Sequence, residues 1–244
     1  AFLDGLALRA PRLFNRLRYS IVDLSPALRA SQKERTAIHS DKISLVGGDA
    51  EALPFADASL DFIVSNEVIA DLRVCPVRRE DVTTDEGGPG AEAVRRFGLA
   101  WDHAPGLFFV NLGAFHFVEE CARVLKPGGT AVMTEYGSHT QFPEQSTHLD
   151  HAEFSIQFGH LKQVAATLKL ETSLEYLPSL LGDIDELLYV RDCVGPKYQI
   201  DIRVSLEEPT PFLLCDTPCN GDCHPPFLSV PLDFAGLAQE AVYL

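Results

Sequence analysis

The sequence ISLVGGDAEALPFADASLDFIVSNE occupies Ile43–Glu67. It contains two apolar runs, Ile43–Val46 and Leu60–Ser65, which are rich in Ile, Val and Leu and do not alternate with polar residues. Such runs are typical of parallel strands that are covered on both faces. The acid Asp49 follows the first run, and polar residues end the second. Because ligands of open α/β sheets bind outside the carboxyl ends of strands, this stretch predicts a binding edge.

Two further segments extend the pattern in both directions. LKPGGTAVMTEYG at Leu125–Gly137 predicts a helix exit through Gly128-Gly129 and then a strand over 130–134. YSIVD at Tyr19–Asp23 predicts a buried strand that also ends in an acid. After it, Ser25-Pro26 supplies an N-cap with proline at the first helical position, which predicts a helix to about residue 36.

The remaining chain is assigned more coarsely. Apolar spacing predicts helices over 107–125 and 158–170, and the helix over 1–17 is broken near Pro11. Residues 79–105 are charged and glycine-containing, which predicts an exposed loop or lid. Strands over 186–190 and 198–205, joined by Gly195-Pro196-Lys197, predict an antiparallel hairpin.

Composition narrows the class of protein. The chain has 244 residues, 46% of them hydrophobic, and a net charge of −15. Such an acidic surface repels phosphate backbones, so we expect no nucleic-acid partner, but instead a small molecule or a basic protein or peptide. The acidity would equally serve solubility alone. We see no apolar run long enough to span a membrane. Six cysteines without a recognisable secretory signal predict a reducing, cytoplasmic location. The oligomeric state is left open.

The order of these segments resembles class I S-adenosylmethionine-dependent methyltransferases. The resemblance implies a Rossmann-like α/β sheet, mostly parallel, with an antiparallel final hairpin strand. It implies a methyltransferase domain over residues 1–205, with 79–105 as an insertion or lid, and a Pro- and Cys-rich appendage over 206–244. The implied cofactor is S-adenosylmethionine, with S-adenosylhomocysteine as product.

The resemblance also assigns cofactor-binding residues. Asp23, with the adjoining Leu24, would hold the ribose diol, although Asp23 could instead cap a helix or lie at the surface. Asp49 and Ala50 would contact the adenine. At the end of the strand over 60–65, the side chains beside the methionine moiety would be Ser65 and Asn66.

Three residues are candidates for the chemistry. Glu67 and Asp71 could pair with a guanidinium or an amine of the acceptor, because two carboxylates suit planar bidentate recognition. The alternative is that these acids only complement a helix dipole. His151 could take the proton released on methyl transfer. Alternatively, His148 and His151 could bind a metal, or the histidines in this region could be ordinary hydrogen-bonded structure.

One family feature is absent from the sequence. Class I methyltransferases carry a glycine-rich G-x-G-x-G turn between a first strand and a first helix. Here Ala1-Phe2-Leu3-Asp4-Gly5 looks like the start of that helix. Either upstream residues were removed or not recorded, or this form binds the cofactor poorly.

A narrower resemblance is to MidA-type methyltransferases, which are linked to complex I assembly through protein arginine methylation. That subgroup has I-V-E-x-S-P-x-L-R-x-x-Q where this chain has IVDLSPALRASQ at Ile21–Gln32. Asn66 and Glu67 also match its N-E pair, whereas Asp71 is displaced by one residue. The GDAEALPFADASLDF segment is closer to small-molecule methyltransferases, so the acceptor is left open between an N or O atom of a small molecule and a basic, arginine-bearing protein.

A cysteine cluster near the end of the sequence belongs to no family motif. Three thiols and an imidazole within ten residues could complete a structural zinc tetrahedron. Free thiols, or a disulfide in an oxidising compartment, are the alternatives. The cluster consists of Cys215, Cys219, Cys223 and His224.

The sequence therefore leaves two possible functions. The first is methyl transfer from S-adenosylmethionine to an N or O acceptor. The alternative is a catalytically inactive methyltransferase-fold protein that acts in binding or assembly.

Overall fold

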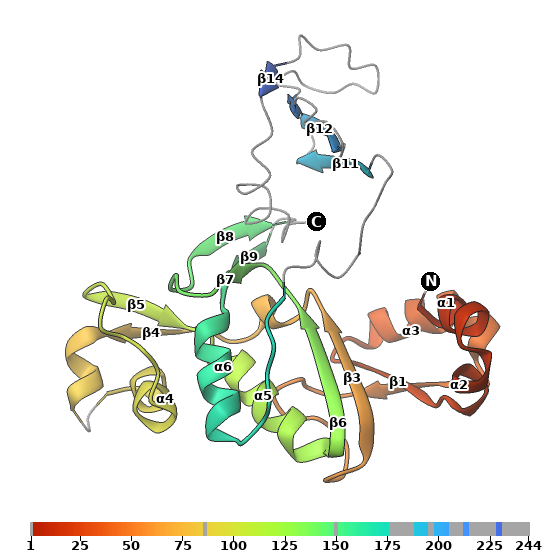
Figure 1. Ribbon diagram of the computed structural model, residues 1–244, viewed down its shortest axis with the longest axis horizontal. Coiled ribbons are helices and arrows are strands. Elements are labelled where there is room, and N and C mark those ends of the chain that lie inside the picture. Colours follow the sequence, from red (N-terminus) through yellow and green to blue (C-terminus); the bar gives the residue numbers. More distant parts are fainter. Residues whose placement is uncertain are drawn as a thin grey trace.

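The computed structural model describes residues 2–84, 87–148 and 151–175, and the backbone of four strands between residues 188 and 230. The side chains of residues 147, 148 and 151 lie outside this description. The predicted mixed α/β architecture with parallel strands is confirmed (Figure 1). No helix in the described part of the chain is both long and apolar enough to cross a membrane.

The N-terminal part contains the first parallel strand pair. β1 pairs with β2 in register from Tyr19↔Ile43 to Asp23↔Gly47. The predicted cap is present: the Ser25 hydroxyl accepts a hydrogen bond from the Leu28 N–H at 3.2 Å. The elements here are α1 (Phe2–Arg9), α2 (Pro11–Arg16), β1 (Tyr19–Asp23), α3 (Pro26–Arg35), the 3-10 helix η1 (Ala37–His39) and β2 (Ile43–Gly47).

The second parallel pair joins β3 (Leu60–Asn66) to β6 (Leu125–Thr134), with Asn66 opposite Thr134. Within the described residues the two parallel pairs are separate hydrogen-bonded units, whereas the sequence predicted one open sheet. An edge of β1 and an edge of β3 therefore have no described strand partner.

The segment between β3 and β6 corrects two predictions. Residues 107–110 form a strand, β5, antiparallel to β4 (Cys75–Arg78), so the predicted helix over 107–125 begins only at Leu112. Where an exposed loop was expected, residues 89–97 form an amphipathic helix with one buried face. The elements are η2 (Ile69–Asp71), β4 (Cys75–Arg78), η3 (Arg79–Thr83), α4 (Pro89–Phe97), β5 (Leu107–Val110) and α5 (Leu112–Val124).

The core lies where α4, α5 and α6 (Phe158–Thr167) meet. Phe115 of α5 is fully buried, and its ring contacts Phe97 of α4 edge-on at a centroid distance of 6.1 Å. Val164 of α6 is equally buried. Burying one such side chain stabilises the fold by about 1.5–3 kcal/mol. Of these three helices, α5 also contacts β6.

Only one face of the β3–β6 pair is packed. Ile63 and Met133 lie against the core, but Phe62, Val64 and Val132 are 51%, 44% and 38% exposed. The non-alternating sequence predicted cover on both faces. The described residues cover the outer face only in part.

The chain after β6 forms short strands and α6. β7 (Gly137–Ser138) pairs in parallel with β10 (Ile156–Gln157), and between them β8 (Gln145–His148) and β9 (His151–Phe154) form a hairpin. The predicted hairpin of β11 (Leu188–Val194) and β12 (Tyr198–Val204) is present. β12 then pairs with β13 (Phe212–Leu214), and β13 with β14 (Leu228–Val230), so the described pairings do not join this hairpin to β3 or β6. The rest of the predicted appendage lies outside the described residues.

Candidate functional site

Asp23 ends β1, and its carboxylate is held from two sides. Oδ1 accepts the Ser25 N–H at 2.8 Å, and Oδ2 accepts the Gln32 side-chain amide at 2.8 Å. Asp23 therefore has the helix-start role that was its alternative interpretation. It also keeps free lone pairs, because each carboxylate oxygen accepts more than one hydrogen bond.

The segment that resembles MidA-type proteins builds this arrangement. Arg29 donates from Nη1 to the Asp23 carbonyl at 2.6 Å and to the Leu24 carbonyl at 3.0 Å. Gln32 holds the carboxylate itself. The Leu24 side chain, in contrast, is 68% exposed and leaves an apolar surface beside Asp23.

Asp49 lies at the same edge as Asp23, because Gly47, two residues before it, is the register partner of Asp23. The Asp49 Oδ1 accepts the Glu51 N–H at 2.8 Å, which closes a tight turn. Gly48 has no room for a side chain: an added Cβ would lie 2.6 Å from Cγ of Pro54. The carboxylate of Asp49 is thus exposed on a rigid turn, and Ala50 packs against the core.

The loop after Asp49 is fixed by two residues that sequence reasoning missed. Glu120 accepts the Leu53 N–H at 2.7 Å, and Arg123 donates to the carbonyls of Leu53 and Phe55 at 2.9 and 2.8 Å. Arg123 also pairs with Glu120, and this hydrogen bond holds the pKa of the Glu120 carboxyl below its usual value. Their i, i+3 spacing in α5 was the available signal. The two side chains attach α5 to the loop that follows Asp49.

The carboxyl ends of β3 and β6 meet in a second group of polar side chains. Thr134 donates its hydroxyl to Asn66 Oδ1 at 2.7 Å, and the Glu67 N–H donates to the Thr134 carbonyl at 3.0 Å. Glu67 has a φ of 52°, a left-handed conformation that is uncommon for a non-glycine residue. Ser65 is buried, and its hydroxyl has no hydrogen-bond partner among the described residues. Left-handed non-glycine residues and unpaired buried hydroxyls are both uncommon, so this strand end is a candidate for a functional role.

Glu135 is the buried acid of this edge. Its two oxygens accept the backbone N–H groups of Ala70 and Tyr136 at 3.0 and 3.1 Å. Burial raises the pKa of Glu135 despite these bonds, and the nearby Glu67 and Glu153 raise it further. The carboxyl end of the β3–β6 pair is consequently acidic.

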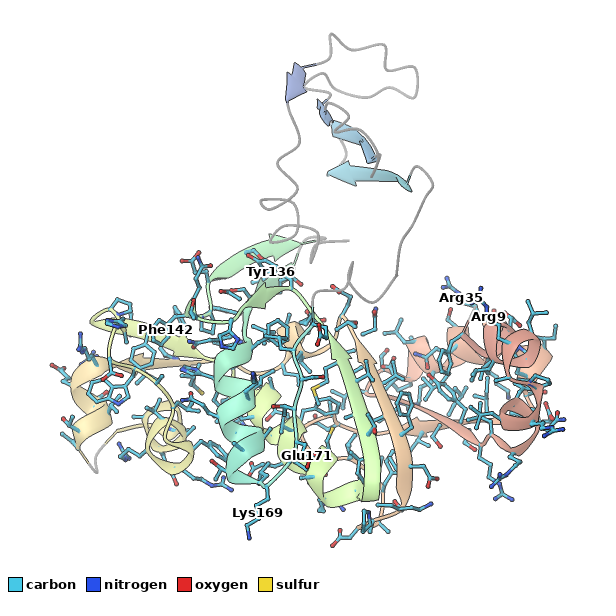
Figure 2. The ribbon with its side chains drawn as sticks, in the orientation of Figure 1. Arg9, Arg35, Tyr136, Phe142, Lys169 and Glu171 are labelled. Carbon is cyan, nitrogen blue, oxygen red and sulfur yellow. The ribbon has the colours of Figure 1, made fainter. Side chains whose placement is uncertain are left out.

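The β8–β9 hairpin lies beside this edge. β9 contacts η2, which contains Asp71, and Glu153 of β9 influences Glu135. Figure 2 shows Tyr136 at the hairpin side of the molecule, with Lys169 at the other end of α6. The backbone of His151 lies on β9 as well, but its side chain is outside the described residues, so its role as a base stays a prediction.

A third cluster joins the turn after β2 to α5 and was not anticipated. Glu51 accepts a hydrogen bond from Arg73 at 2.8 Å and lies 3.0 Å from His116 Nδ1. Burial alone would raise the pKa of Glu51, but the hydrogen bonds from Arg73 and His116 outweigh it and lower the pKa. Because these residues are 22 and 65 positions away from Glu51, no local pattern signals the cluster.

Metal binding receives no support from the part of the chain that the structure describes. No group of three or more His, Cys, Asp or Glu side chains there is arranged to hold a metal ion. The predicted zinc ligands Cys215, Cys219, Cys223 and His224 lie outside the described residues.

Comparison with known proteins adds one finding at the level of sequence families. Residues 4–80 match the family model described as a methyltransferase domain. This range contains α3, β1, β2 and β3, and with them Asp23, Asp49 and Asn66. The chain matches none of the curated proteins.

Two solved structures match this chain at low sequence identity. The [4+2]-cyclase SpnF is 16% identical with a TM-score of 0.40; the similarity covers 68% of this chain and 46% of the SpnF chain. The PH0226 protein from Pyrococcus horikoshii OT3 is 14% identical with a TM-score of 0.37, covering 79% of this chain and 73% of that one. These TM-scores are too low to establish a shared fold. The matched region corresponds to less than half of the length of the cyclase chain.

Proposed function

We propose that this protein is an S-adenosylmethionine-dependent methyltransferase. The observation that carries the proposal is the placement of Asp23 and Asp49 at the carboxyl ends of adjacent parallel strands. Ligands of α/β sheets bind at this edge, and two carboxylates there suit a nucleoside with a ribose diol and an exocyclic amino group. The match of residues 4–80 to a methyltransferase domain supports the same conclusion.

The residues at the edge fit the parts of this cofactor. Asp23 would accept the ribose hydroxyls, and the exposed Leu24 would cover part of the nucleoside. Asp49 would accept the adenine amino group, with the backbone of Ala50 beside the ring. Ser65, whose buried hydroxyl has no partner among the described residues, and the amide of Asn66 would face the methionine part.

The second group of polar side chains would serve the acceptor. When bound, S-adenosylmethionine supplies an electrophilic methyl group on a sulfonium. The protein contributes mainly position, because holding an acceptor in line with the methyl removes much of the entropic barrier. Glu67 and Asp71 would orient the acceptor through its N–H or O–H groups, and His151 would take up the released proton.

The acidic edge favours a basic acceptor over a neutral one. The nearby carboxyls of Glu67 and Glu153 both raise the pKa of Glu135, and Asp71 lies in η2 against the same hairpin. A guanidinium or ammonium would relieve the repulsion between these carboxylates. We therefore favour an arginine-bearing peptide segment, as in the MidA-type resemblance, over a neutral small molecule.

The proposal is tested by calorimetric titration with S-adenosylhomocysteine. The parent chain is compared with Asp23→Ala and Asp49→Ala, and with Asp41→Ala as a surface control. Asp41 is exposed and precedes the first residue of β2, at the opposite end of the strand pair from Asp23 and Asp49. We expect binding by the parent and the control, and none by the two edge variants. Equal binding by all four chains would refute the assigned edge.

The acceptor class needs a separate experiment. Radiolabelled methyl groups are supplied as S-adenosylmethionine to a lysate with the protein. Label in basic proteins supports the favoured acceptor. Label confined to the low-mass fraction would point to a small molecule and would overturn that choice.

One observation favours the alternative, an inactive methyltransferase-fold protein in binding or assembly. Both oxygens of Asp23 are already hydrogen-bonded within the protein, to Ser25 and Gln32. If the only role of Asp23 is to make these two hydrogen bonds, the titration will show no binding by the parent chain, even when residues are added upstream.

A further inference from the structure

The charge of this chain is divided unevenly along its length. Residues 1–42, which contain α1, α2, β1, α3 and η1, carry eight Lys and Arg against four Asp and Glu, a net charge of +4. Residues 43–244 carry twelve against thirty-one, a net charge of −19. Figure 1 shows α1, α2 and α3 together at one end of the molecule. The overall charge of −15 therefore hides a basic end, which consists of residues 2–42.

Most cations of the basic end have no partner within the protein. Asp4, one of its few acids, is already hydrogen-bonded to His39 at 2.8 Å, and Asp23 holds the two bonds described above. Figure 2 labels two of the free cations at this end. Six cations are exposed, and their side chains make no hydrogen bond or ion pair in the part of the chain that the structure describes: Arg9, Arg12, Arg16, Arg18, Lys33 and Arg35.

Helix dipoles account for only some of these cations. Arg9, Arg16 and Arg35 are the last residues of α1, α2 and α3, where a positive charge complements the dipole. Arg12 lies in the first turn of α2, where a cation is unfavourable, and it is four residues from Arg16, so the two like charges repel. Arg18 lies between α2 and β1. Arg12 and Arg18 thus have no evident role in the fold.

Large apolar side chains are exposed beside these arginines. Leu8 precedes Arg9 and is 82% exposed, and Leu13 follows Arg12 and is 55% exposed. Ile38 of η1 is 82% exposed as well. Single exposed apolar residues are ordinary, but here they alternate with unpaired cations on consecutive elements at one end of the molecule. The basic end therefore presents charge and apolar surface together.

The inner sides of the same helices are packed, so the exposed side chains belong to folded elements. Leu3 of α1 is buried. The ring of Phe14 in α2 meets the His39 ring edge-on at a centroid distance of 5.5 Å, and Lys42 Nζ lies 4.8 Å from the centre of the Phe14 ring. These contacts fix α2 against η1 and the start of β2, and they leave the side that carries Leu13 outermost.

An anionic lipid surface matches both properties of the basic end. Its headgroups attract Lys and Arg, and leucines beside them can enter the boundary with the acyl chains. Nucleic acid offers phosphates without an apolar layer. Protein interfaces place apolar residues at a buried centre and polar ones at the rim, whereas here each leucine adjoins an arginine. The acidic remainder of the chain lies behind this end, and salt screens charges more than about 10 Å apart.

We propose that the basic end attaches this protein to the surface of an anionic membrane. The arginines between residues 9 and 18 would contact the headgroups, and Leu8 and Leu13 would enter the boundary with the acyl chains. Since no helix among the described residues is able to cross a membrane, these helices would lie on the surface. The proposal does not depend on methyl transfer, because none of these residues belongs to the proposed cofactor site.

The test is co-sedimentation of the 244-residue chain with vesicles of phosphatidylcholine, either alone or mixed with phosphatidylserine. We expect binding to the mixed vesicles only, and weaker binding as salt is added. The double variant Arg12→Gln with Arg18→Gln should bind about thirtyfold more weakly, because each basic residue near an anionic surface contributes similarly to binding. The matched control is Arg78→Gln with Lys169→Gln, which changes the net charge equally at two exposed cations outside the basic end. It should bind as the parent does.

A second double variant, Leu8→Gln with Leu13→Gln, isolates the apolar contribution. Both side chains are exposed, so thermal unfolding should be unchanged while vesicle binding weakens. Four results would each overturn the proposal: no binding to the mixed vesicles, equal binding to phosphatidylcholine alone, equal losses in the two charge variants, or loss of binding when the chain is extended upstream of Ala1. Binding to polyglutamate but not to the mixed vesicles would overturn it in favour of an acidic protein partner.

Discussion

Gln32 is predicted to control the affinity of the proposed nucleoside site without contacting the ligand. Its side-chain amide donates to Asp23 Oδ2 at 2.8 Å, and the Ser25 N–H holds the other oxygen. The substitution Gln32→Leu preserves approximate volume and removes this donor. The Asp23 carboxylate is then free to rotate out of the plane that a ribose diol requires.

The magnitude follows from the bond that is lost. A hydrogen bond to a charged group contributes about 1.5–3 kcal/mol. Asp23 is only partly buried, so water replaces some of this, and the lower end of the range applies. Since about 1.4 kcal/mol corresponds to a factor of ten, the affinity for S-adenosylhomocysteine should fall about tenfold.

The assay is calorimetric titration of Gln32→Leu, with Lys33→Ala as the control. Lys33 is the next residue of α3 and is exposed, so its substitution should leave the affinity unchanged. Thermal unfolding of both variants shows whether α3 is intact. An unchanged affinity in Gln32→Leu would refute the positioning role. Tighter binding would show instead that Gln32 competes with the ribose for the same lone pairs.

Three further predictions concern the packed part of the molecule. Gly113→Ala should lower the free energy of unfolding in urea by about 1–3 kcal/mol, because the added Cβ would lie 2.6 Å from the backbone nitrogen of Arg73; unchanged stability would show that this contact relaxes freely. Burial raises the pKa of Cys121 to about 12, so iodoacetamide at pH 8 should modify it only after unfolding, as mass spectrometry would show; modification of the native protein would contradict this. Because the folded-state pKa of Glu135 is raised, the free energy of unfolding should fall as the pH rises from the ordinary glutamate pKa through the raised one. Thermal unfolding scans at a series of pH values should show this pH dependence in the parent and not in Glu135→Gln.

The strands and caps that position the site could be predicted because their signals are local. Ile43–Val46 is followed at once by glycines and Asp49, and Ser25-Pro26 begins α3 with both the side-chain oxygen and the proline that a helix start favours. Parallel pairing then places Asp23 and Asp49 at one edge. Each step needs only neighbouring residues and the direction of a strand.

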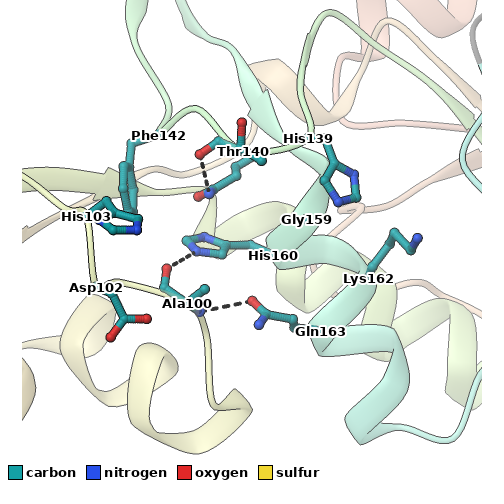
Figure 3. A pocket seen from close by; sticks show the side chains of 11 residues that line it. Ala100, Asp102, His103, His139, Thr140, Phe142, Gly159, His160, Lys162 and Gln163 are labelled. Atoms are coloured by element: carbon teal, nitrogen blue, oxygen red, sulfur yellow. Dashed lines mark hydrogen bonds between the residues drawn. The ribbon is translucent and has the colours of Figure 1, made fainter.

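The features that the sequence could not predict depend on partners far along the chain. The apolar spacing of 107–125 favours a helix, but residues 107–110 pair with Cys75–Arg78 and become a strand. The exposure of Phe62 and Val64 depends on which helices reach the outer face of β3, and strand composition carries no such information. His160 is one of four histidines between residues 139 and 160, and the sequence does not distinguish it from the other three. Its distinction is a bond to Ala100, sixty residues away (Figure 3).

The unpaired edges of β1 and β3 lead to a last prediction. Both strands end at the candidate site, and neither has a described hydrogen-bonded neighbour on its second edge. Unpaired N–H and C=O groups of a strand readily pair with a further strand. The class I resemblance expects one more strand, followed by a glycine-rich turn. A strand of this kind that lay beside β1 and β3 in the sheet would complete both pairs.

Amide hydrogen exchange tests this prediction. The 244-residue chain is compared with the same chain extended upstream of Ala1, both with and without S-adenosylhomocysteine. If the additional strand inserts, the amides of β1 and β3 should exchange more slowly in the extended chain, because a strand that gains a second neighbour opens less often. The amides of α4 serve as an internal control, since that helix packs in the core on α5 and α6 and should not change. Unchanged exchange in β1 and β3, together with unchanged ligand affinity, would mean that the two parallel pairs are complete as they stand and that the edge between them binds something other than a strand.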